Sequence, residues 1–183
     1  MKKTISTIAI LTIGYLTVQL NIGYAQAMIY KRDIINPETL TTVVKLNDPS
    51  TYERTEAKFL NEVNTKALRY FKKQYKDIND EKWYTLSNGY LAEFNANSSK
   101  NLVVYDKKGN WKFTISYYDE KNLPPEIRSI VKPTYYDYTI SRVEEIHVND
   151  KIIYLVHIQN ETSLKTVRVC NGEMELMEEF NRQ

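Results

Sequence analysis

The chain has 183 residues, with 25 lysines and arginines against 23 aspartates and glutamates, five glycines and one cysteine. Residues 1–27 contain two lysines and no acid, so the remainder is formally neutral. A neutral chain with interspersed charges lacks the basic surface that nucleic acids or anionic membranes attract, and one cysteine excludes an internal disulfide.

The N-terminus is typical of a secretory signal peptide. Lys2 and Lys3 precede a mostly apolar stretch over residues 5–20, and Ala25-Gln26-Ala27 matches the motif that signal peptidase cleaves. The alternative is a membrane anchor, but the stretch contains several threonines and is shorter than the roughly 20 apolar residues of a span. We therefore expect cleavage after Ala27, export to the periplasm or the extracellular space, and no stable membrane insertion.

An N-terminal arm and one long helix are expected next. Residues 28–50 show no clear period, contain two proline-ended pairs, and include a candidate edge strand over residues 41–46. From Tyr52 to Tyr75, apolar residues recur at spacings of three and four, which predicts a helix with one buried face. The members of that face are Leu60, Val63, Ala67, Phe71 and Tyr75.

The first strands follow this helix. Asn88-Gly89 predicts a tight hairpin turn between residues 83–86 and 90–95, because both residues tolerate positive φ. Residues 101–117 predict a second hairpin with Gly109 at its tip. Its return strand alternates, with Trp111, Phe113, Ile115 and Tyr117 expected on one side, which is typical of a sheet with one packed and one wet face.

The second half repeats this order. Leu123-Pro124-Pro125 opens a short predicted helix that ends near Pro133. Strands are expected over residues 138–148 and 152–158, and residues 164–180 form another hairpin around Gly172. The repetition indicates an internal duplication. We therefore predict an α+β fold of two tandem units, residues 51–118 and 119–183, each a helix packed on an antiparallel sheet of about four strands.

Candidate chemistry is sparse. The glycines after residue 27 all lie at predicted hairpin turns, which leaves none for a phosphate-binding loop. His147 and His157 could hold a metal with a carboxylate, and Cys170 could pair with His157 as nucleophile and base, but neither pair has a diagnostic spacing. Glu173 and Glu175 alternate as on a solvent-facing strand. We predict no catalytic, cofactor-binding or metal-binding residues, and a protein that is not an enzyme.

Tyrosine is unusually frequent, with 15 in the chain. Tyrosine combines a large apolar ring with a polar tip and is common at recognition surfaces, although it also packs between helix and sheet. We predict a binding face for a protein or peptide partner, formed by Tyr90, Tyr105, Trp111, Tyr117, Tyr118, Tyr136 and Tyr154. The alternative is a small-ligand pocket between helix and sheet, lined by Trp83, Phe94 or Trp111.

Several of these elements together resemble a known family. The order of helix and strands, the tip Tyr105-Asp106-Lys107-Lys108-Gly109-Asn110-Trp111, and the linker Leu123-Pro124-Pro125-Glu126-Ile127 are similar to the PepSY-like, β-lactamase-inhibitor-like domains of exported bacterial proteins. The resemblance covers roughly residues 51–183. It implies a concave sheet that grips a protein partner and no catalytic residues, hence a non-enzymatic binding or inhibitor-like protein of the bacterial envelope.

Overall fold

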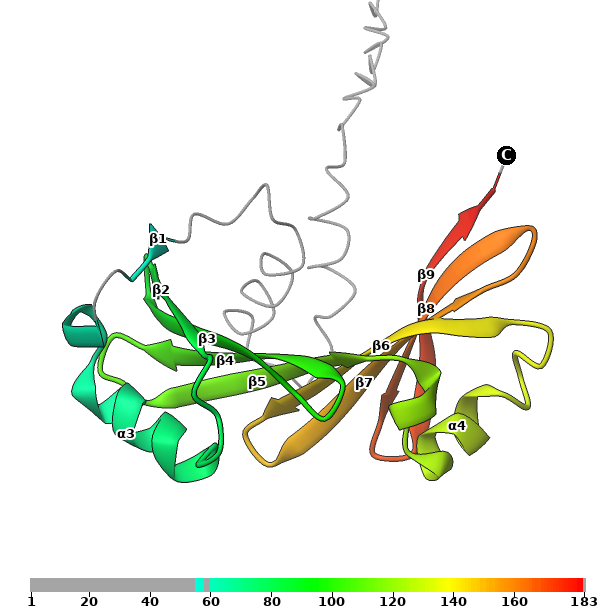
Figure 1. The fold of residues 1–183 in the computed structure, drawn as a ribbon. Helices are drawn as coiled ribbons and strands as arrows, with labels where there is room; N and C mark the ends of the chain where they lie inside the picture. Colours follow the sequence, from blue (N-terminus) through cyan, green and yellow to red (C-terminus); the bar gives the residue numbers. More distant parts are fainter. Residues whose placement is uncertain (1–54, 58–59, 183) are drawn as a thin grey trace, which may run out of the picture.

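The computed structural model describes residues 55–57 and 60–182. They form one antiparallel sheet of nine strands, in which every strand pairs with its sequence neighbours (Figure 1). The strands are β1 (Thr55–Glu56), β2 (Lys82–Leu86), β3 (Gly89–Ala96), β4 (Ser99–Asp106), β5 (Trp111–Tyr118), β6 (Thr139–Val148), β7 (Lys151–Gln159), β8 (Ser163–Cys170) and β9 (Glu173–Asn181). The predicted signal segment, the arm and its candidate strand lie outside the described residues.

Short turns at the predicted positions connect the strands. Asn149 and Asn171 have φ values of 52°, and Gly109 and Gly172 have values of 76° and 80°. Glycine and asparagine adopt this left-handed conformation at lower cost than other residues, so they stand in the short connections of two to four residues that reverse the chain. The predicted hairpins around residues 88–89, 109, 149–150 and 172 are confirmed.

The first helix is shorter than predicted. Helix α3 spans Thr65–Gln74, and the apolar pattern before it belongs to a 3₁₀ turn, η1, over Leu60–Glu62. Asn64 separates the two, because its side-chain oxygen accepts a hydrogen bond from the backbone N–H of Lys66 at 2.8 Å and so caps the helix. The predicted start at residue 52 was wrong for the described part of that segment, where residues 55–56 form strand β1.

The second helix begins as the prolines predict. After the 3₁₀ turn η2 (Glu120–Asn122), helix α4 spans Pro125–Val131 with a proline in its first turn. A proline costs little there, because the first N–H groups of a helix have no partner within it. Ile127 and Val131 are its buried residues.

The predicted fold class of two helix-on-sheet units was wrong. Strand β5 pairs with β6 from Phe113 opposite Val148 to Tyr118 opposite Val143, so the strands of both halves form one continuous sheet. Pairing two edges satisfies backbone N–H and C=O groups that separate sheets would leave open. The two short helices lie on the same side of this sheet (Figure 1). The proposed duplication and its boundaries stay a prediction.

The helix-covered face contains two hydrophobic clusters. Under α3, Phe71 contacts the rings of Trp83 and Phe94 at centroid distances of 5.4 and 5.3 Å. This cluster comprises Val63, Ala67, Phe71, Trp83, Ala92, Phe94, Val103 and Tyr105. The cluster near α4 comprises Tyr118, Leu123, Ile127, Val131, Ile140, Val143, Val156, Ile158, Val167 and Val169.

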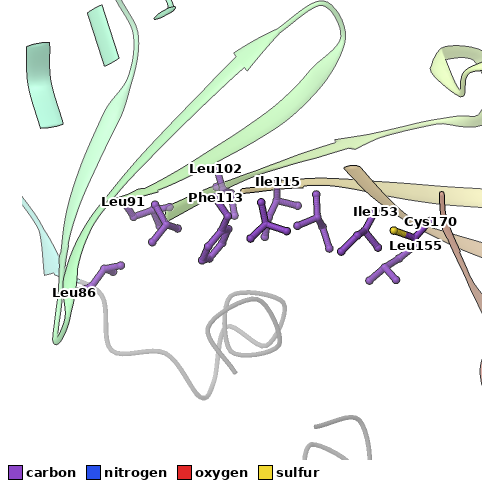
Figure 2. Close-up of a cluster of buried hydrophobic side chains, with 11 residues drawn as sticks. Leu86, Leu91, Leu102, Phe113, Ile115, Ile153, Leu155 and Cys170 are labelled. Carbon is purple, nitrogen blue, oxygen red and sulfur yellow. The ribbon is translucent and has the colours of Figure 1, made fainter. Parts of the chain in front are cut away.

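A third cluster occupies the opposite face, which we call the helix-free face because no described helix packs on it. Figure 2 shows these side chains along one side of the sheet. They are Leu86, Leu91, Leu102, Val104, Phe113, Ile115, Ile146, Val148, Ile153, Leu155 and Cys170, and all are buried. The expectation of one packed face and one wet face was therefore wrong, since both faces carry buried apolar side chains.

Trp111 also departs from the predicted alternation. Tyr105 lies opposite Trp111 whereas Val104 lies opposite Phe113, so Lys112 is an extra residue in the ladder. Such a bulge interrupts the alternation of side chains between the two faces. Trp111 therefore packs against the α3 cluster, and Phe113 belongs to the helix-free face.

Candidate binding face of the sheet

The structure distributes the predicted tyrosine-rich surface over different places. Tyr90, Tyr105 and Trp111 belong to or pack against the α3 cluster, and Tyr118 and Tyr154 belong to or pack against the α4 cluster. Tyr117 alone packs on the helix-free face, and Tyr136 is 80% exposed in the segment after α4. The seven residues do not share one surface, and their contact with a partner stays a prediction.

Two of these tyrosines occupy contrasting buried environments. The hydroxyl of Tyr105 is buried without a hydrogen-bond partner in the part of the chain that the structure describes, and burial raises its pKa far above the ordinary value. The hydroxyl of Tyr118 donates to Glu145 at 2.5 Å. Burial is the main cause of the raised pKa of Tyr118, and the negative charge of Glu145 adds to it.

Glu145 connects Tyr118 to His147 on the helix-covered face. His147 Nε2 lies 2.5 Å from Glu145 Oε1, while Glu145 Oε2 accepts from Tyr118. Burial by itself would raise the pKa of Glu145, but the hydrogen bonds from His147 and Tyr118 outweigh it and the pKa is lowered. This site therefore holds a carboxylate in its charged form.

A row of mostly polar residues crosses the helix-free face, one residue from each strand from β4 to β9. Each member lies opposite the next in the strand register. We call it the polar row; its members are Lys100, Tyr117, Glu144, Leu155, Arg168 and Glu175. Side chains that face each other across antiparallel strands are close enough to interact, and Arg168 binds Glu175 at 3.0 Å.

Glu144 is the buried centre of this row. Only 1% of its side chain is exposed, and its Oε1 binds Arg142 Nη2 at 2.8 Å and His157 Nε2 at 2.9 Å. The other ring nitrogen of His157, Nδ1, lies 3.2 Å from Thr166 Oγ1. Because a buried carboxylate is costly without partners, these contacts fix both side chains, while 54% of Arg142 remains exposed.

Glu144, His157 and Thr166 follow the order carboxylate, imidazole, hydroxyl that hydrolases use to activate a nucleophile. Thr166 is only 9% exposed and stands within a paired strand, opposite His157 on one side and Glu178 on the other. Thr166 therefore lies inside the sheet, between two neighbouring strands, and not on an open loop or at a helix N-terminus. The arrangement fits a structural hydrogen-bond network better than a catalytic one.

Exposed apolar side chains lie beyond this network at the β8–β9 end. Leu164 lies opposite Phe180, and they are 38% and 47% exposed. Leu164 is two residues from Thr166 on a regular strand, which places the pair on the helix-free face. This end therefore presents an apolar pair on the same face as the half-exposed side chain of Arg142 and the partly exposed ring of His157.

The other chemical candidates are separated. His147 and His157 face opposite sides of the sheet, each bound to its own glutamate. Cys170 lies opposite Ile153 whereas His157 lies opposite Thr166, a separation of about 13 Å along the strands. Residues 55–57 and 60–182 contain no group of three or more candidate metal-binding side chains. None of the helices placed there is long and apolar enough to span a membrane.

The alternative small-ligand site coincides with the α3 cluster. Trp83 and Phe94 are 3% and 2% exposed, and both contact the ring of Phe71. Direct ring contacts therefore fill the region where a pocket was expected. Trp83 Nε1 is buried there without a hydrogen-bond partner among the residues placed in the structure.

Solved structures share this architecture. A BLIP-like protein from Bacteroides fragilis is 20% identical with a TM-score of 0.54, covering 65% of this chain and 86% of its own. The chain has a BLIP-like fold. A DUF2874 family protein from Bacteroides ovatus is 18% identical with a TM-score of 0.54, covering 65% of this chain and 87% of its own. No known protein family and no curated protein matches the sequence.

A third structure belongs to a protein of Bacteroides eggerthii that is predicted to be periplasmic, at 14% identity and a TM-score of 0.52, covering 65% of this chain and 88% of its own. The expected β-lactamase-inhibitor-like architecture is thus confirmed at the level of the BLIP-like fold. Assignment to PepSY-like proteins stays a prediction.

The charged and polar residues of the helix-free face were not predicted as a site from the sequence. Arg142 and Glu144 alternate along one strand and Thr166 and Arg168 along another, which indicates a common face within each strand. The register between those strands brings the residues together, and no local pattern specifies that register.

Proposed function

We propose that this BLIP-like chain is an exported, non-enzymatic binding or inhibitor-like protein of the bacterial envelope, which recognises a protein through the helix-free face. The predicted signal supports export. The fold shared with the Bacteroides fragilis protein supports protein binding, because that protein is described as BLIP-like. The site favours recognition over catalysis, since the group of Glu144, His157 and Thr166 is enclosed within paired strands.

The observation that carries the proposal is the combination of charged and apolar side chains at the β6–β9 end. Arg142 is held by the buried Glu144, and the exposed pair Leu164 and Phe180 lies nearby on the same face. Arginine and aromatic side chains contribute strongly to protein interfaces when their positions are fixed before binding. We propose Arg142, His157, Leu164 and Phe180 as contacts, with Tyr117 and Tyr136 as the predicted tyrosines that remain candidates.

Capture from envelope extract tests this surface. The exported chain is immobilised, and the proteins that it retains are compared with those retained by Arg142→Glu and Phe180→Ser. Arg128→Glu is the matched control, because Arg128 lies on α4 with 52% of its side chain exposed, close to the 54% of Arg142. We expect a retained protein to bind the parent and Arg128→Glu and to be lost with Arg142→Glu and Phe180→Ser.

Equal retention by all four forms would refute this surface. Tyr117→Phe and Tyr136→Ala then examine the predicted tyrosines separately. Because Tyr136 lies after α4, a loss with Tyr136→Ala alone would move recognition to the α4 end. Circular dichroism of every variant shows that the sheet persists, so lost capture cannot be attributed to unfolding.

A further inference from the structure

The outward side of helix α3 carries positive charge only. Lys66, Arg69 and Lys73 recur at spacings of three and four residues, which places them on one side of the helix, and all three are exposed. Ala67 is fully buried on the opposite side, in the α3 cluster. The helix contains no aspartate or glutamate. The even balance of charge over the whole sequence does not reveal this local excess.

The tip between β4 and β5 extends this surface. Lys107 and Lys108 are exposed there, and Asn64 at the start of α3 donates a hydrogen bond to the backbone carbonyl of Lys107 at 3.2 Å. Asp106, the acid at this tip, binds the backbone and side-chain nitrogens of Asn110 at 2.8 Å each. Two segments of the chain thus form one surface, which we call the basic face; its members are Lys66, Arg69, Lys73, Lys107 and Lys108.

The cations of α3 oppose the stability of the helix in its first half. Lys66 is the second residue of the helix, where the positive end of the helix dipole favours an anion. Arg69 lies three residues after Lys66 and four before Lys73, and like charges at such spacings repel each other. Among the described residues, the only cation of α3 in an ion pair is Lys72, which binds Glu81 at 2.9 Å. Local conflicts of this kind are typical of functional sites, so the stripe indicates an external anion.

We propose that the basic face binds the surface of an anionic phospholipid bilayer, so that the chain adsorbs to a membrane without inserting into it. Each lysine or arginine near an anionic leaflet raises the partition coefficient by about fivefold, so five of them give reversible adsorption. The inference goes beyond the proposed recognition of a protein and does not depend on it. The basic face belongs to the α3 end of the sheet, whereas the proposed contacts belong to the β6–β9 end (Figure 1).

Other anionic partners fit this surface less well. Cations that hold a single-stranded nucleic acid line a groove, whereas these side chains project from the outward side of a helix. A second copy of the chain would offer β9, but Glu175 and Glu179 are already held by Arg168 and Lys165. The mobile headgroups of a bilayer can meet all five cations at once. Leu60, which is 57% exposed in η1 before α3, adds apolar surface that a bilayer interface accepts.

Cosedimentation with vesicles tests the proposal. The exported chain is mixed with vesicles of phosphatidylglycerol and phosphatidylcholine in equal parts, or of phosphatidylcholine alone, and the bound fraction is measured at about 0.1 M and about 1 M salt. We expect binding to the anionic vesicles alone. We expect it to be lost at the higher salt concentration, because the Debye length falls from about 10 Å to about 3 Å.

Substitutions locate the contact. Lys66→Gln/Arg69→Gln/Lys73→Gln should weaken binding to the anionic vesicles by roughly 100-fold, since three cations are removed. Lys107→Gln/Lys108→Gln should weaken it by roughly 20-fold and leaves α3 unchanged, so it replaces the triple variant if that variant does not fold.

The matched control removes the same charge from the other end of the sheet. Lys121 and Arg128, before and within α4, are 63% and 52% exposed, and Arg182 is exposed after β9. Lys121→Gln/Arg128→Gln/Arg182→Gln should change binding by less than about threefold, because these residues lie beyond the screening distance from the basic face. The emission of Trp83 in the α3 cluster shows that each variant is folded.

Equal binding of the parent chain to both kinds of vesicle would overturn the proposal. So would an equal loss for the two triple variants, because net charge would then explain the binding. Binding to a soluble RNA homopolymer but not to vesicles, or self-association that the basic-face variants abolish, would assign the surface to another partner. Phe180→Ser should bind vesicles like the parent, so failure of vesicle binding and failure of protein capture are distinguishable.

Discussion

Glu144 and Glu145 are adjacent in the sequence, yet their carboxylates serve opposite faces of the sheet. Glu144 binds His157 and Arg142 on the helix-free face, and Glu145 binds Tyr118 and His147 on the helix-covered face. Alternation along β6 produces this arrangement, because successive side chains of a strand point to opposite sides. Each histidine is thereby assigned to a different carboxylate.

Glu145 should make the stability of the protein depend on pH in acid. Its folded-state pKa is lowered, so below the ordinary value of about 4.3 the unfolded chain binds more protons. The stabilisation is complete above that value and is lost as the pH falls through the lowered folded pKa. We expect Glu145→Gln to reduce the free energy of unfolding by about 1–2 kcal/mol at pH 7 and by less near pH 3.

Urea unfolding of the parent and variant across this pH range measures the difference. Glu173→Gln is the control, because Glu173 is exposed at the start of β9 and its substitution should change little at any pH. A Glu145→Gln effect of the same size at pH 3 and pH 7 would contradict the assigned charge state.

Removal of the buried hydroxyls of Tyr105 and Tyr118 should have different effects on the stability of the protein. Tyr105→Phe deletes a hydroxyl without a partner among the described residues, so it should be neutral or stabilise the fold by up to about 1 kcal/mol. Tyr118→Phe deletes the donor to Glu145 and should destabilise by about 1–2 kcal/mol. Thermal and urea unfolding at pH 7 provide the comparison. Destabilisation by Tyr105→Phe equal to that by Tyr118→Phe would show that the Tyr105 hydroxyl has a partner in solution.

The first glycine tip is packed against the start of α3. Asn64 Nδ2 donates to the carbonyl of Lys107 at 3.2 Å, and a Cβ on Gly109 would lie 2.5 Å from Asn64 Oδ1 and 2.8 Å from the backbone nitrogen of Ala67. Gly172 has a similar positive φ but open space around it. The two repeated tips therefore differ in their surroundings more than in their backbone.

Because of this difference, substitution of alanine for the two glycines should reduce the free energy of unfolding by unequal amounts. Gly172→Ala should cost about 1 kcal/mol, which is the penalty of a left-handed conformation for a residue with a Cβ. Gly109→Ala adds a clash with backbone and should cost about 2–4 kcal/mol. The free energy of urea unfolding at pH 7 distinguishes them. Equal costs would mean that the tip at Gly109 moves away from α3 without penalty.

Turn chemistry made the hairpins predictable, whereas the arrangement of the whole sheet was not. Asn88-Gly89 and Gly109 predict reversals from two or three residues, and Pro125 predicts the start of α4. The junction of β5 and β6 depends on edges separated by a helix, and no local pattern specifies which edges pair. The same reason explains why one sheet was mistaken for two.

The candidate face was harder to predict than the elements that carry it. Trp111 changes sides because of the bulge at Lys112, which hydrophobic alternation alone does not show. Tyr105 and Tyr118 are buried by helices, so tyrosine frequency indicated packing there as much as recognition. Arg142 and His157 meet only through the register of β6 and β7.

The two margins of the sheet are unequal. On one side β1 has two residues, while on the other β9 presents nine, and no described strand pairs with its outer side. A long open margin with exposed Leu176 would invite polymerisation through intermolecular strand addition. Glu175 and Glu179 are held by Arg168 and Lys165 on β8, and Glu173 at the start of β9 adds a further carboxylate. Charged side chains along this margin disfavour the addition of an identical strand.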